Sequence, residues 1–315
     1  MKILYSTDDN YSKICYASIN SLFESNKNVN KLAVYIIDNN ISKSMKKKIS
    51  ELALSYKREL FYISCKRICK NLIKNNSFPI SAYARLFIQN EIEDDKVIYI
   101  DCDTLVNNDL TDLWNINLNN NWVGGVIDPL PNYLKTAVGM EPEDSYINSG
   151  VLIINLLEWR KNDFKSKVIK FIEEHDYNVV HHDQGIINGI CKNRVMFIHP
   201  KYNLMPEFIY MNEKKIKRLY KLKYFYNNNE LEEAKTSPSI VHFISKFYNR
   251  PWFKECTHPY KDKFNSFYFK VSNNLSSNPL SKKVILQKFV YEKLPFVLFV
   301  IIERLLDIKR RRLLK

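Results

Sequence analysis

Short runs of apolar residues alternate with amphipathic segments along the first third of the chain. The apolar runs have the length of buried strands, whereas the amphipathic segments repeat their apolar residues with the period of a helix. This alternation predicts an α/β fold with a mostly parallel central sheet. The expected strands span residues 2–6, 31–38, 59–64 and 96–101, and the expected helices span residues 11–23, 42–56 with Ser42 as N-cap, and 81–92.

The pattern continues in the second half of the chain. A further strand is predicted over residues 146–156, and an apolar run at 239–247 precedes Pro251 and Trp252. In open sheets of this class, ligands bind at the carboxyl ends of the strands. Acidic pairs follow two of these strands, namely Asp8-Asp9 after the first and Asp101-x-Asp103 after the fourth. These two strand ends are therefore the first places to look for a functional site.

Asp101 and Asp103 stand two residues apart, with Cys102 between them. On an extended backbone, residues i and i+2 project to the same side, so both carboxylates can aim at one point. Hard divalent cations prefer oxygen ligands and keep open positions for phosphate oxygens, which makes a metal site one interpretation. The alternative is a turn cap, because Asp is common where a strand enters a turn.

Composition narrows the class of protein. The chain has 315 residues, of which 45% are hydrophobic and 13% aromatic, so it can bury a large core. The six cysteines show no C-x-x-C spacing, and the N-terminal sequence lacks the pattern of a secretory signal. We therefore expect reduced thiols and a cytoplasmic protein. The six glycines all lie between Gly124 and Gly189 and form neither G-x-G-x-x-G nor a Walker loop, which excludes those two nucleotide-binding motifs.

The positive charge is concentrated at the C-terminal end. The formal net charge is +14, and residues 282–315 carry ten Lys and Arg against three Asp and Glu. Nine uninterrupted apolar residues, 294–302, precede the basic end. Nine are too few to span a bilayer, which takes about 20. An interfacial helix on an anionic membrane surface is expected, with a helix packed on the rest of the protein as the alternative. Nucleic acid is not expected, because no nucleic-acid-binding motif accompanies the charge.

Five segments, in order and spacing, resemble the family 8 glycosyltransferases. They read MKILYSTDDNY, SAYARLFI, VIYIDCDTLVNNDLTDLW, YINSGVLIINLLEWR and DQGIIN. The resemblance covers residues 1–260 and is nearest to the bacterial lipopolysaccharide galactosyl- and glucosyltransferases. It implies a GT-A fold as the catalytic domain, a UDP-sugar donor, Mn²⁺ with Mg²⁺ as an alternative ion, and transfer with retention of configuration. Residues 261–315 then form a separate helical, membrane-associating region.

The resemblance also implies roles for single residues. His242 joins Asp101 and Asp103 as the third metal ligand, although a histidine in an apolar run is by itself more typical of a core. His199 and His258 are expected to be structural. The residues expected at the nucleotide are Ser6, Thr7, Asp8, Asn10, Tyr11, the backbone of Cys102, and Lys246 or Arg250 for the diphosphate; those expected at the sugar are Arg85, Asp128, Asn148, Asp183 and Gln184.

Two of these segments allow other interpretations. The sequence TDDNY is also typical of a polar helix N-terminus. His181-His182-Asp183 could be a metal cluster, but adjacent side chains diverge in direction. Retention requires either a carboxylate nucleophile or attack by the acceptor on the front face of the sugar. Gln184 matches the position that faces the anomeric carbon and is a poor nucleophile. We therefore expect front-face transfer, with Gln184 and the neighbouring carboxylate Asp183 as the catalytic residues.

The late segment HFISKFYNRPW departs from the family pattern. Ser245 stands where the family has glycine, and Arg250 replaces the lysine before Pro251. Lys246 is a second candidate for the diphosphate contact.

The resemblance implies that the chain moves galactose or glucose from a UDP-hexose to a surface glycan such as lipopolysaccharide or lipooligosaccharide. The alternatives are a transferase that extends a protein-linked glycan and a non-catalytic protein that binds sugar nucleotides or membranes.

Overall fold

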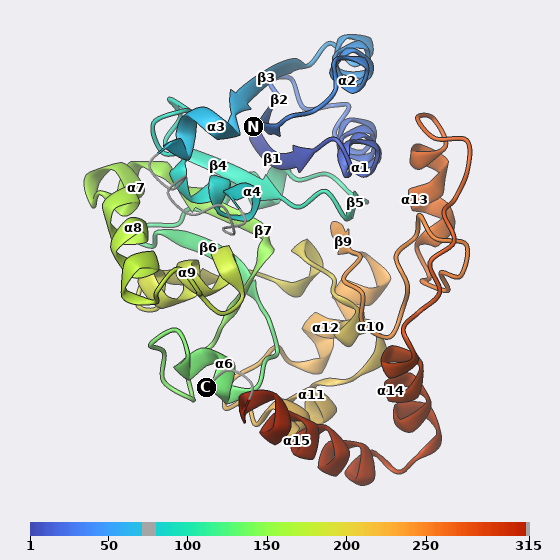
Figure 1. Cartoon of the computed structure of the whole chain (residues 1–315). Coiled ribbons are helices and arrows are strands. Elements are labelled where there is room, and N and C mark those ends of the chain that lie inside the picture. Colours follow the sequence, from blue (N-terminus) through green and yellow to red (C-terminus); the bar gives the residue numbers. More distant parts are fainter. Residues whose placement is uncertain (71–79, 313–315) are drawn as a thin grey trace.

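The computed structural model describes residues 1–70 and 80–312 and contains a seven-stranded sheet covered by helices on both faces (Figure 1). The strand order is β3-β2-β1-β4-β7-β6-β8, and β7 alone among them runs antiparallel to its neighbours. The prediction of an α/β fold with a mostly parallel sheet is thereby confirmed. The strands are β1 (Lys2–Asp8), β2 (Ala33–Asn39), β3 (Glu59–Ser64), β4 (Lys96–Ile100), β6 (Val123–Ile127), β7 (Ile147–Asn155) and β8 (Val195–Phe197).

Alternate residues of the central strands point into two separate cores. In β4, Ile98 and Ile100 belong to the core on one face of the sheet, whereas Val97 and Tyr99 belong to the core on the other face. The two faces are covered by different sets of helices. The first carries α1 (Ser12–Ser25), α2 (Lys43–Ser55) and α13 (Lys261–Tyr268), and the second carries α7 (Leu156–Lys161), α8 (Phe164–Glu174) and α9 (His182–Cys191).

Most of the strands and helices expected in the first 110 residues are present. Ser42 caps α2 as predicted, because its hydroxyl oxygen accepts the backbone N–H of Met45. The helix expected over 81–92 is wrong beyond residue 87. The chain there forms α4 (Ile80–Tyr83) and a 3₁₀ turn, η2 (Ala84–Phe87), and then leaves the helical path. Every residue from Tyr83 to Ile88 is buried, so this segment has no solvent face and its tertiary contacts decide its conformation.

A second, two-stranded sheet lies beside the main one. It pairs β5 (Thr104–Val106), directly after the acidic pair, with β9 (Ile240–His242) in antiparallel register. The connecting segments consist of short helices. These are α3 (Cys65–Ile68), α5 (Thr111–Asn115), α6 (Asn132–Thr136), η3 (Pro200–Tyr202), α10 (Pro206–Tyr210), α11 (Glu213–Tyr220) and α12 (Asn228–Thr236).

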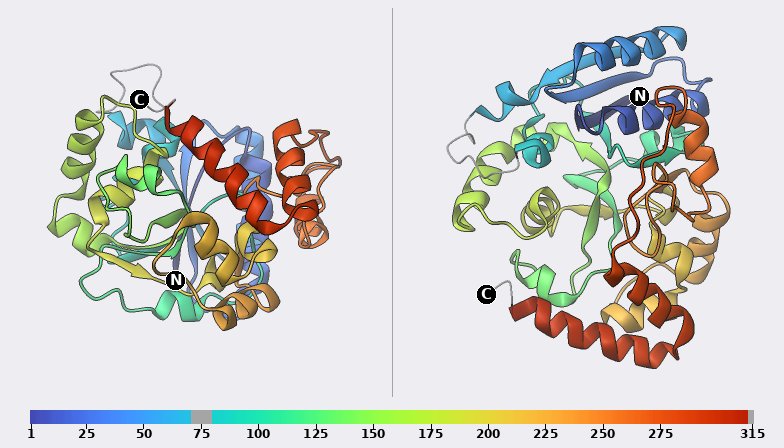
Figure 2. Two further views of the ribbon diagram at one scale, coloured as in Figure 1. Left: turned by 90° about the horizontal axis from the view of Figure 1, so that it is seen from below. Right: turned by 45° about the vertical axis from the view of Figure 1, so that its right-hand side comes forward.

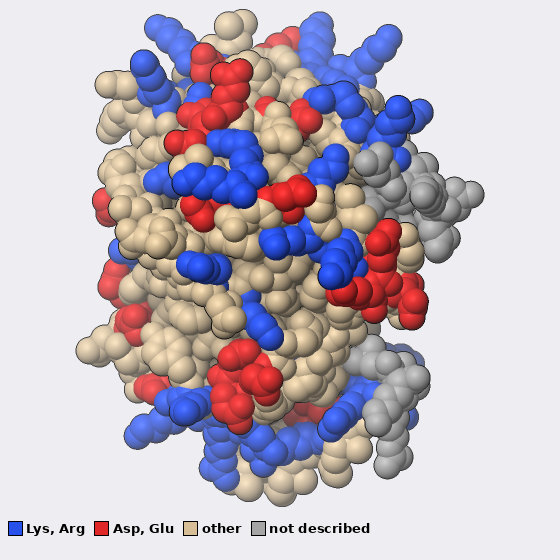
Figure 3. Space-filling view, turned by 90° about the vertical axis from the view of Figure 1, so that its left-hand side faces the viewer, with Lys and Arg blue, Asp and Glu red and all other residues tan. Residues whose placement is uncertain are grey.

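The C-terminal region ends in two helices, α14 (Lys282–Lys293) and α15 (Phe296–Arg312), and α15 crosses the lower end of the molecule beside α11 and α6 (Figure 2). Phe299, Val300 and Glu303 are buried against the rest of the protein, which fits the alternative of a packed helix. The opposite side of α15 is apolar and exposed. Basic side chains gather along this lower edge (Figure 3). Within the described part of the chain, no helix has the length and apolar character needed to cross a bilayer.

Candidate functional site

The two sheets bring the predicted metal ligands together. β4 ends at Ile100, so Asp101 and Asp103 lie at its carboxyl end, and Thr104 pairs with His242 across the β5–β9 ladder. The Nε2 atom of His242 lies 3.4 Å from Asp103 Oδ1 and 3.9 Å from Asp101 Oδ2. One ligand atom from each residue lies within 4.8 Å of the other two. Two carboxylates and an imidazole suit a divalent ion such as Mn²⁺.

His242 is oriented by a second layer of polar side chains. Its Nδ1 lies 3.0 Å from Asn203 Oδ1, and Asn203 Nδ2 in turn donates to Asn148 Oδ1 at 2.9 Å. With a proton on Nδ1, the Nε2 lone pair faces the two carboxylates, as in many metal sites. Burial alone would lower the pKa of His242, but the charges of Asp103 and Asp101 outweigh it and raise the pKa. The imidazole is therefore held by the same carboxylates that would share the ion.

Arg85 is a buried cation that links this acidic cluster to Asp183. Its guanidinium forms ion pairs with Asp101 at 3.0 Å and with Asp183 at 3.4 Å, and it lies 3.9 Å from the ring centroid of Tyr99. It also donates to the carbonyl oxygen of Ser149 at 3.1 Å. Burial raises the pKa of Asp183, and Arg85 opposes that rise. Arg85 thus links a carboxylate at the end of β4 to a carboxylate in the first turn of α9.

Asp128, Asn148 and Gln184 form a hydrogen-bonded network next to Arg85. Asp128 Oδ2 accepts from Asn148 Nδ2 and from Gln184 Nε2, each at 3.0 Å. Gln184 Oε1 accepts the backbone N–H of Ser149 at 3.0 Å. Burial, followed by the charge of Glu207, raises the pKa of Asp128. The network offers oriented donors and acceptors, which hydroxyl-rich ligands require.

An open cavity of about 670 Å³ joins the acidic cluster to the end of β1. Its lining includes Arg85, Arg250, His182, Ala82 and these predicted residues: Ser6, Thr7, Asp8, Tyr11, Asp101, Cys102 and Asp103. Asn10 is absent from that lining and donates to Asp8 at 3.4 Å. Asp8 also accepts the backbone N–H of Tyr11 at 3.0 Å, so this segment forms the turn before α1 as well as the cavity wall. The Cys102 thiol turns to the carbonyl oxygen of Ser6.

The two candidate cations of the late segment lie in different places. Arg250 forms an ion pair with Asp103 at 3.4 Å, and its guanidinium also donates to the hydroxyl of Tyr11. Lys246 lies outside this cavity, paired with Glu207 at 2.7 Å and with the Tyr220 hydroxyl at 2.6 Å. The structure therefore brings Arg250, and not Lys246, to the acidic cluster.

The alternative metal cluster at His181-His182-Asp183 does not form. Among residues 1–70 and 80–312, Asp101, Asp103 and His242 are the one group of His, Cys, Asp or Glu with metal-ligating geometry. His182 Nδ1 instead lies 3.2 Å from the Tyr83 hydroxyl. His258 is buried against Phe243 and Tyr248, and so it has the structural role expected of it.

Sequence reasoning missed two residues of the site. Asn203 belongs to no motif, and nothing in its surroundings along the chain indicates that it supports His242. Gly150 was detectable, because a glycine inside a strand suggests a close approach of another group. A β-carbon at Gly150 would lie 2.1 Å from Cε1 of His242, so only glycine leaves room for the imidazole.

The chain resembles known proteins in sequence and in fold. The family model described as glycosyl transferase family 8 matches residues 2–256. General stress protein A of Bacillus subtilis is 28% identical over 286 residues, which cover 89% of this chain and 96% of that protein. The lipopolysaccharide 1,2-glucosyltransferase of Escherichia coli is 29% identical over 209 residues, covering 64% and 61% of the two chains. The crystal structure of the galactosyltransferase LgtC, with donor and acceptor sugar analogues, superposes with a TM-score of 0.68 at 23% identity and covers 89% of this chain and 98% of its own. The chain belongs to glycosyltransferase family 8.

Proposed function

We propose that this glycosyltransferase moves a hexose, galactose or glucose, from a UDP-hexose to a glycan acceptor with retention of configuration and with Mn²⁺, or Mg²⁺, as cofactor. The observation that carries the proposal is the convergence of Asp101, Asp103 and His242 at the end of an open cavity that also holds Arg85 and Arg250. Acidic side chains that can bind a metal ion and basic side chains that can bind a diphosphate lie side by side there.

The three candidate ligand side chains suit a divalent cation held between the protein and a diphosphate. Asp101 and Asp103 supply hard oxygens, and His242 supplies a nitrogen that favours Mn²⁺ over Mg²⁺. When bound, the ion supplies Lewis-acid stabilisation of the leaving diphosphate. Arg250 already touches Asp103 and Tyr11, and so it can rotate onto a diphosphate oxygen with little movement. A planar guanidinium suits that contact.

The nucleoside would lie over the end of β1. Ser6, Thr7, Asp8 and Tyr11 line the cavity there, and Asn10 lies next to them through its hydrogen bond to Asp8. Asp8 can accept the N3–H of uracil, and the exposed ring of Tyr11 offers a face for stacking. The backbone at Cys102 would run along the ribose, because its thiol is turned away to Ser6.

The hexose would contact Arg85, Asp128, Asn148, Asp183 and Gln184. Gln184 is fixed at both ends of its amide, by Asp128 and by the Ser149 N–H, so it can flank the anomeric carbon without attacking it. In front-face transfer, the bond from the anomeric carbon to the diphosphate oxygen breaks. A bond to the acceptor hydroxyl oxygen forms on the same face, and the hydroxyl proton passes to the departing diphosphate. Asp183 stays paired with Arg85 throughout.

The acceptor we propose is a surface glycan such as lipopolysaccharide or lipooligosaccharide, at the cytoplasmic face of the membrane. The similarity to a lipopolysaccharide glucosyltransferase supports that choice. The outward side of α15 supports the location, because Val297, Leu298, Ile301, Leu305 and Ile308 are exposed there beside basic residues. Such a surface suits an anionic leaflet.

Thermal shift with UDP, with and without Mn²⁺, tests the nucleotide and metal parts of the proposal. We expect UDP to raise the melting temperature further when Mn²⁺ is present, and Asp101→Asn to remove that metal-dependent part. Hydrolysis of UDP-glucose, UDP-galactose and UDP-N-acetylglucosamine then identifies the donor. A protein that UDP stabilises equally with and without Mn²⁺, and that hydrolyses none of these donors, would refute the proposal.

A further inference from the structure

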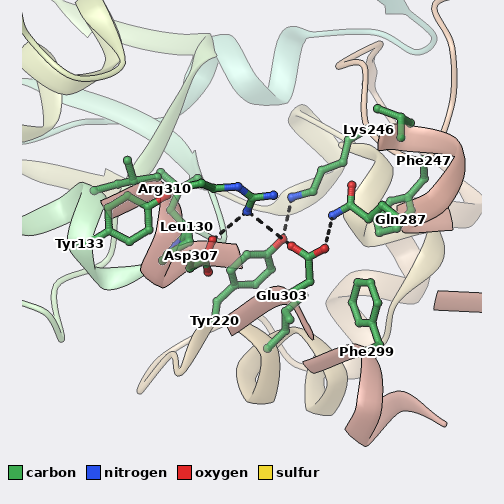
Figure 4. Close-up of a pocket in the computed structure, with 14 residues that line it drawn as sticks. Leu130, Tyr133, Tyr220, Lys246, Phe247, Gln287, Phe299, Glu303, Asp307 and Arg310 are labelled. Atoms are coloured by element: carbon green, nitrogen blue, oxygen red, sulfur yellow. Dashed lines mark hydrogen bonds and ion pairs between the residues drawn. The ribbon is translucent and has the colours of Figure 1, made fainter. Parts of the chain in front are cut away.

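A second cavity, of about 290 Å³, lies between the catalytic part of the chain and the two C-terminal helices (Figure 4). One wall comes from the segment after Asp128, which includes Leu130 and Tyr133, and from Tyr220 of α11. The late segment contributes Lys246 and Phe247. The opposite wall comes from α14 and α15. The volume is at the lower end of the range for small-molecule sites, about that of one or two sugar rings.

Buried charges connect this cavity to the proposed hexose site. Lys246 lines the cavity and pairs with Glu207, and the charges of both residues act on Asp128. Glu207 is 3% exposed and is not part of the cavity lining, so it acts on the cavity through its ion pair with Lys246.

The C-terminal helices place polar side chains in the cavity rather than apolar ones. Glu303, which is 8% exposed, accepts from Gln287 of α14 at 3.0 Å and from Arg310 at 3.5 Å. Arg310 also pairs with Asp307 at 2.8 Å. Figure 4 shows these side chains converging on Lys246 and Tyr220 from the other wall. A helix that only packed on the protein, or only lay on a membrane, would gain nothing from burying a carboxylate here.

The charged and aromatic side chains that line the cavity indicate the class of ligand. Two cations, Lys246 and Arg310, and two carboxylates, Glu303 and Asp307, line the cavity, so the site has no excess of positive charge for an anion. The aromatic rings in the lining are those of Tyr133, Tyr220, Phe247 and Phe299. Aromatic faces together with carboxylate, amide and guanidinium groups suit a neutral sugar, whose rings are apolar on their C–H faces and carry hydroxyls at their edges.

We propose that this cavity binds a neutral sugar residue of the acceptor, and that α14 and α15 form one side of the acceptor site through Gln287, Glu303, Asp307 and Arg310. This inference rests on the proposed transferase function. It adds that the C-terminal helices take part in substrate recognition. Glu303 and Gln287 then decide how well the acceptor binds, while the donor is held at the other cavity.

The test measures how donor turnover divides between acceptor and water in the full-length protein with Mn²⁺. The neutral acceptor probes are methyl β-glucoside, methyl β-galactoside and methyl β-N-acetylglucosaminide, and galactose 6-phosphate is the anionic probe. For the best neutral probe, Glu303→Gln and Gln287→Ala should each raise the acceptor KM at least fivefold and lower kcat much less. Glu292→Gln, the same chemical change on α14 outside the cavity lining, should leave the acceptor KM as in the unaltered protein.

The outcomes separate this inference from the proposed function. Donor hydrolysis without transfer to any neutral glycoside, a preference for galactose 6-phosphate, or an unchanged acceptor KM in both cavity variants would overturn the acceptor assignment alone. An unaltered protein that hydrolyses no donor would overturn the proposed function, and this inference with it. Stabilisation by UDP and Mn²⁺ reports separately whether each variant is folded.

Discussion

Gly150 and His242 are in such close contact that a β-carbon on the glycine would lie 2.1 Å from the imidazole Cε1. Atoms cannot approach that closely, so Gly150→Ala must displace the histidine ring. We expect the affinity for Mn²⁺ to fall at least tenfold, the range seen when the orientation of a ligand is lost. The metal-dependent stabilisation by UDP reports this affinity. Thermal shift against Mn²⁺ concentration measures it.

Gly124→Ala is the matched control for that substitution. Gly124 is also a buried strand glycine, but its β-carbon would meet the flexible end of Leu118 at 3.0 Å. A similar loss of Mn²⁺ affinity in both variants would mean that His242 is not a ligand and that the effect is a general one on the sheet.

Arg85→Lys keeps the positive charge but should lower the stability of the protein strongly. Lysine cannot span Asp101 and Asp183 at once, so one buried carboxylate loses its partner. Breaking a buried pair in this way costs about 3–5 kcal/mol. Urea unfolding measures the change, and Arg67→Lys, at an exposed pair with Glu91, is the control with an expected cost of about 0–1 kcal/mol. Equal losses at the two positions would contradict the bridging role of Arg85.

Gln184→Ala distinguishes front-face transfer from a mechanism that needs a nucleophile at this position. Removal of one oriented polar group should slow transfer by about 100-fold and leave a measurable rate. UDP and Mn²⁺ should still stabilise the variant, because Gln184 is not in the lining of the cavity proposed for the nucleotide. Complete loss of transfer with intact UDP binding would favour a covalent intermediate.

His258 makes the fold sensitive to acid. Burial lowers its pKa to about 4 from 6.5, so the folded protein holds the neutral ring. Between pH 6.5 and pH 4 the unfolded chain takes up a proton that the folded chain does not, and the free energy of unfolding falls as the pH falls. The loss reaches about 3 kcal/mol at most. Urea unfolding between about pH 7 and pH 4 measures the slope, which should be smaller in His258→Gln. The same slope in both proteins would rule out His258 as the cause.

The exposed side of α15 should carry the membrane interaction. Ile301→Glu combined with Leu305→Glu places two charges on exposed apolar positions, so binding to anionic vesicles should fall sharply while the fold is kept. Co-sedimentation with phosphatidylglycerol vesicles measures it. The control is Leu54→Glu, at an exposed leucine of α2 on the opposite end of the molecule. Undiminished binding in the double variant would show that the membrane contact lies on another surface.

Several parts of the fold and the site follow from the sequence itself. The alternation of apolar runs predicts the parallel strands, and the position of Asp101 and Asp103 at the end of a predicted strand marks them as candidate site residues. Both predictions depend on local sequence patterns. His242 was predicted only through the family resemblance. The ladder that brings it to Asp103 pairs segments far apart in the chain, and no local pattern encodes that pairing.

Other parts depend on tertiary contacts that no local pattern reports. Arg250 was the candidate for the diphosphate and Lys246 a second one, and the structure places them in different cavities. The 3₁₀ turn at η2 replaced an expected helix because Arg85 and its neighbours are buried on every side. The buried polar face of α15 was not predicted, because Glu303 and Arg310 find their partners on α14 and within α15 itself.

The β5–β9 ladder has a consequence for the order in which the protein is made. Asp101 and Asp103 leave the ribosome early, while His242 and Arg250 follow only after most of the catalytic chain has been synthesised. Until then the nascent chain carries a pair of acids without His242 or the cation of Arg250 beside them. The candidate metal site is thus completed only late in synthesis, and a chain interrupted before residue 240 would present the acid pair without that site.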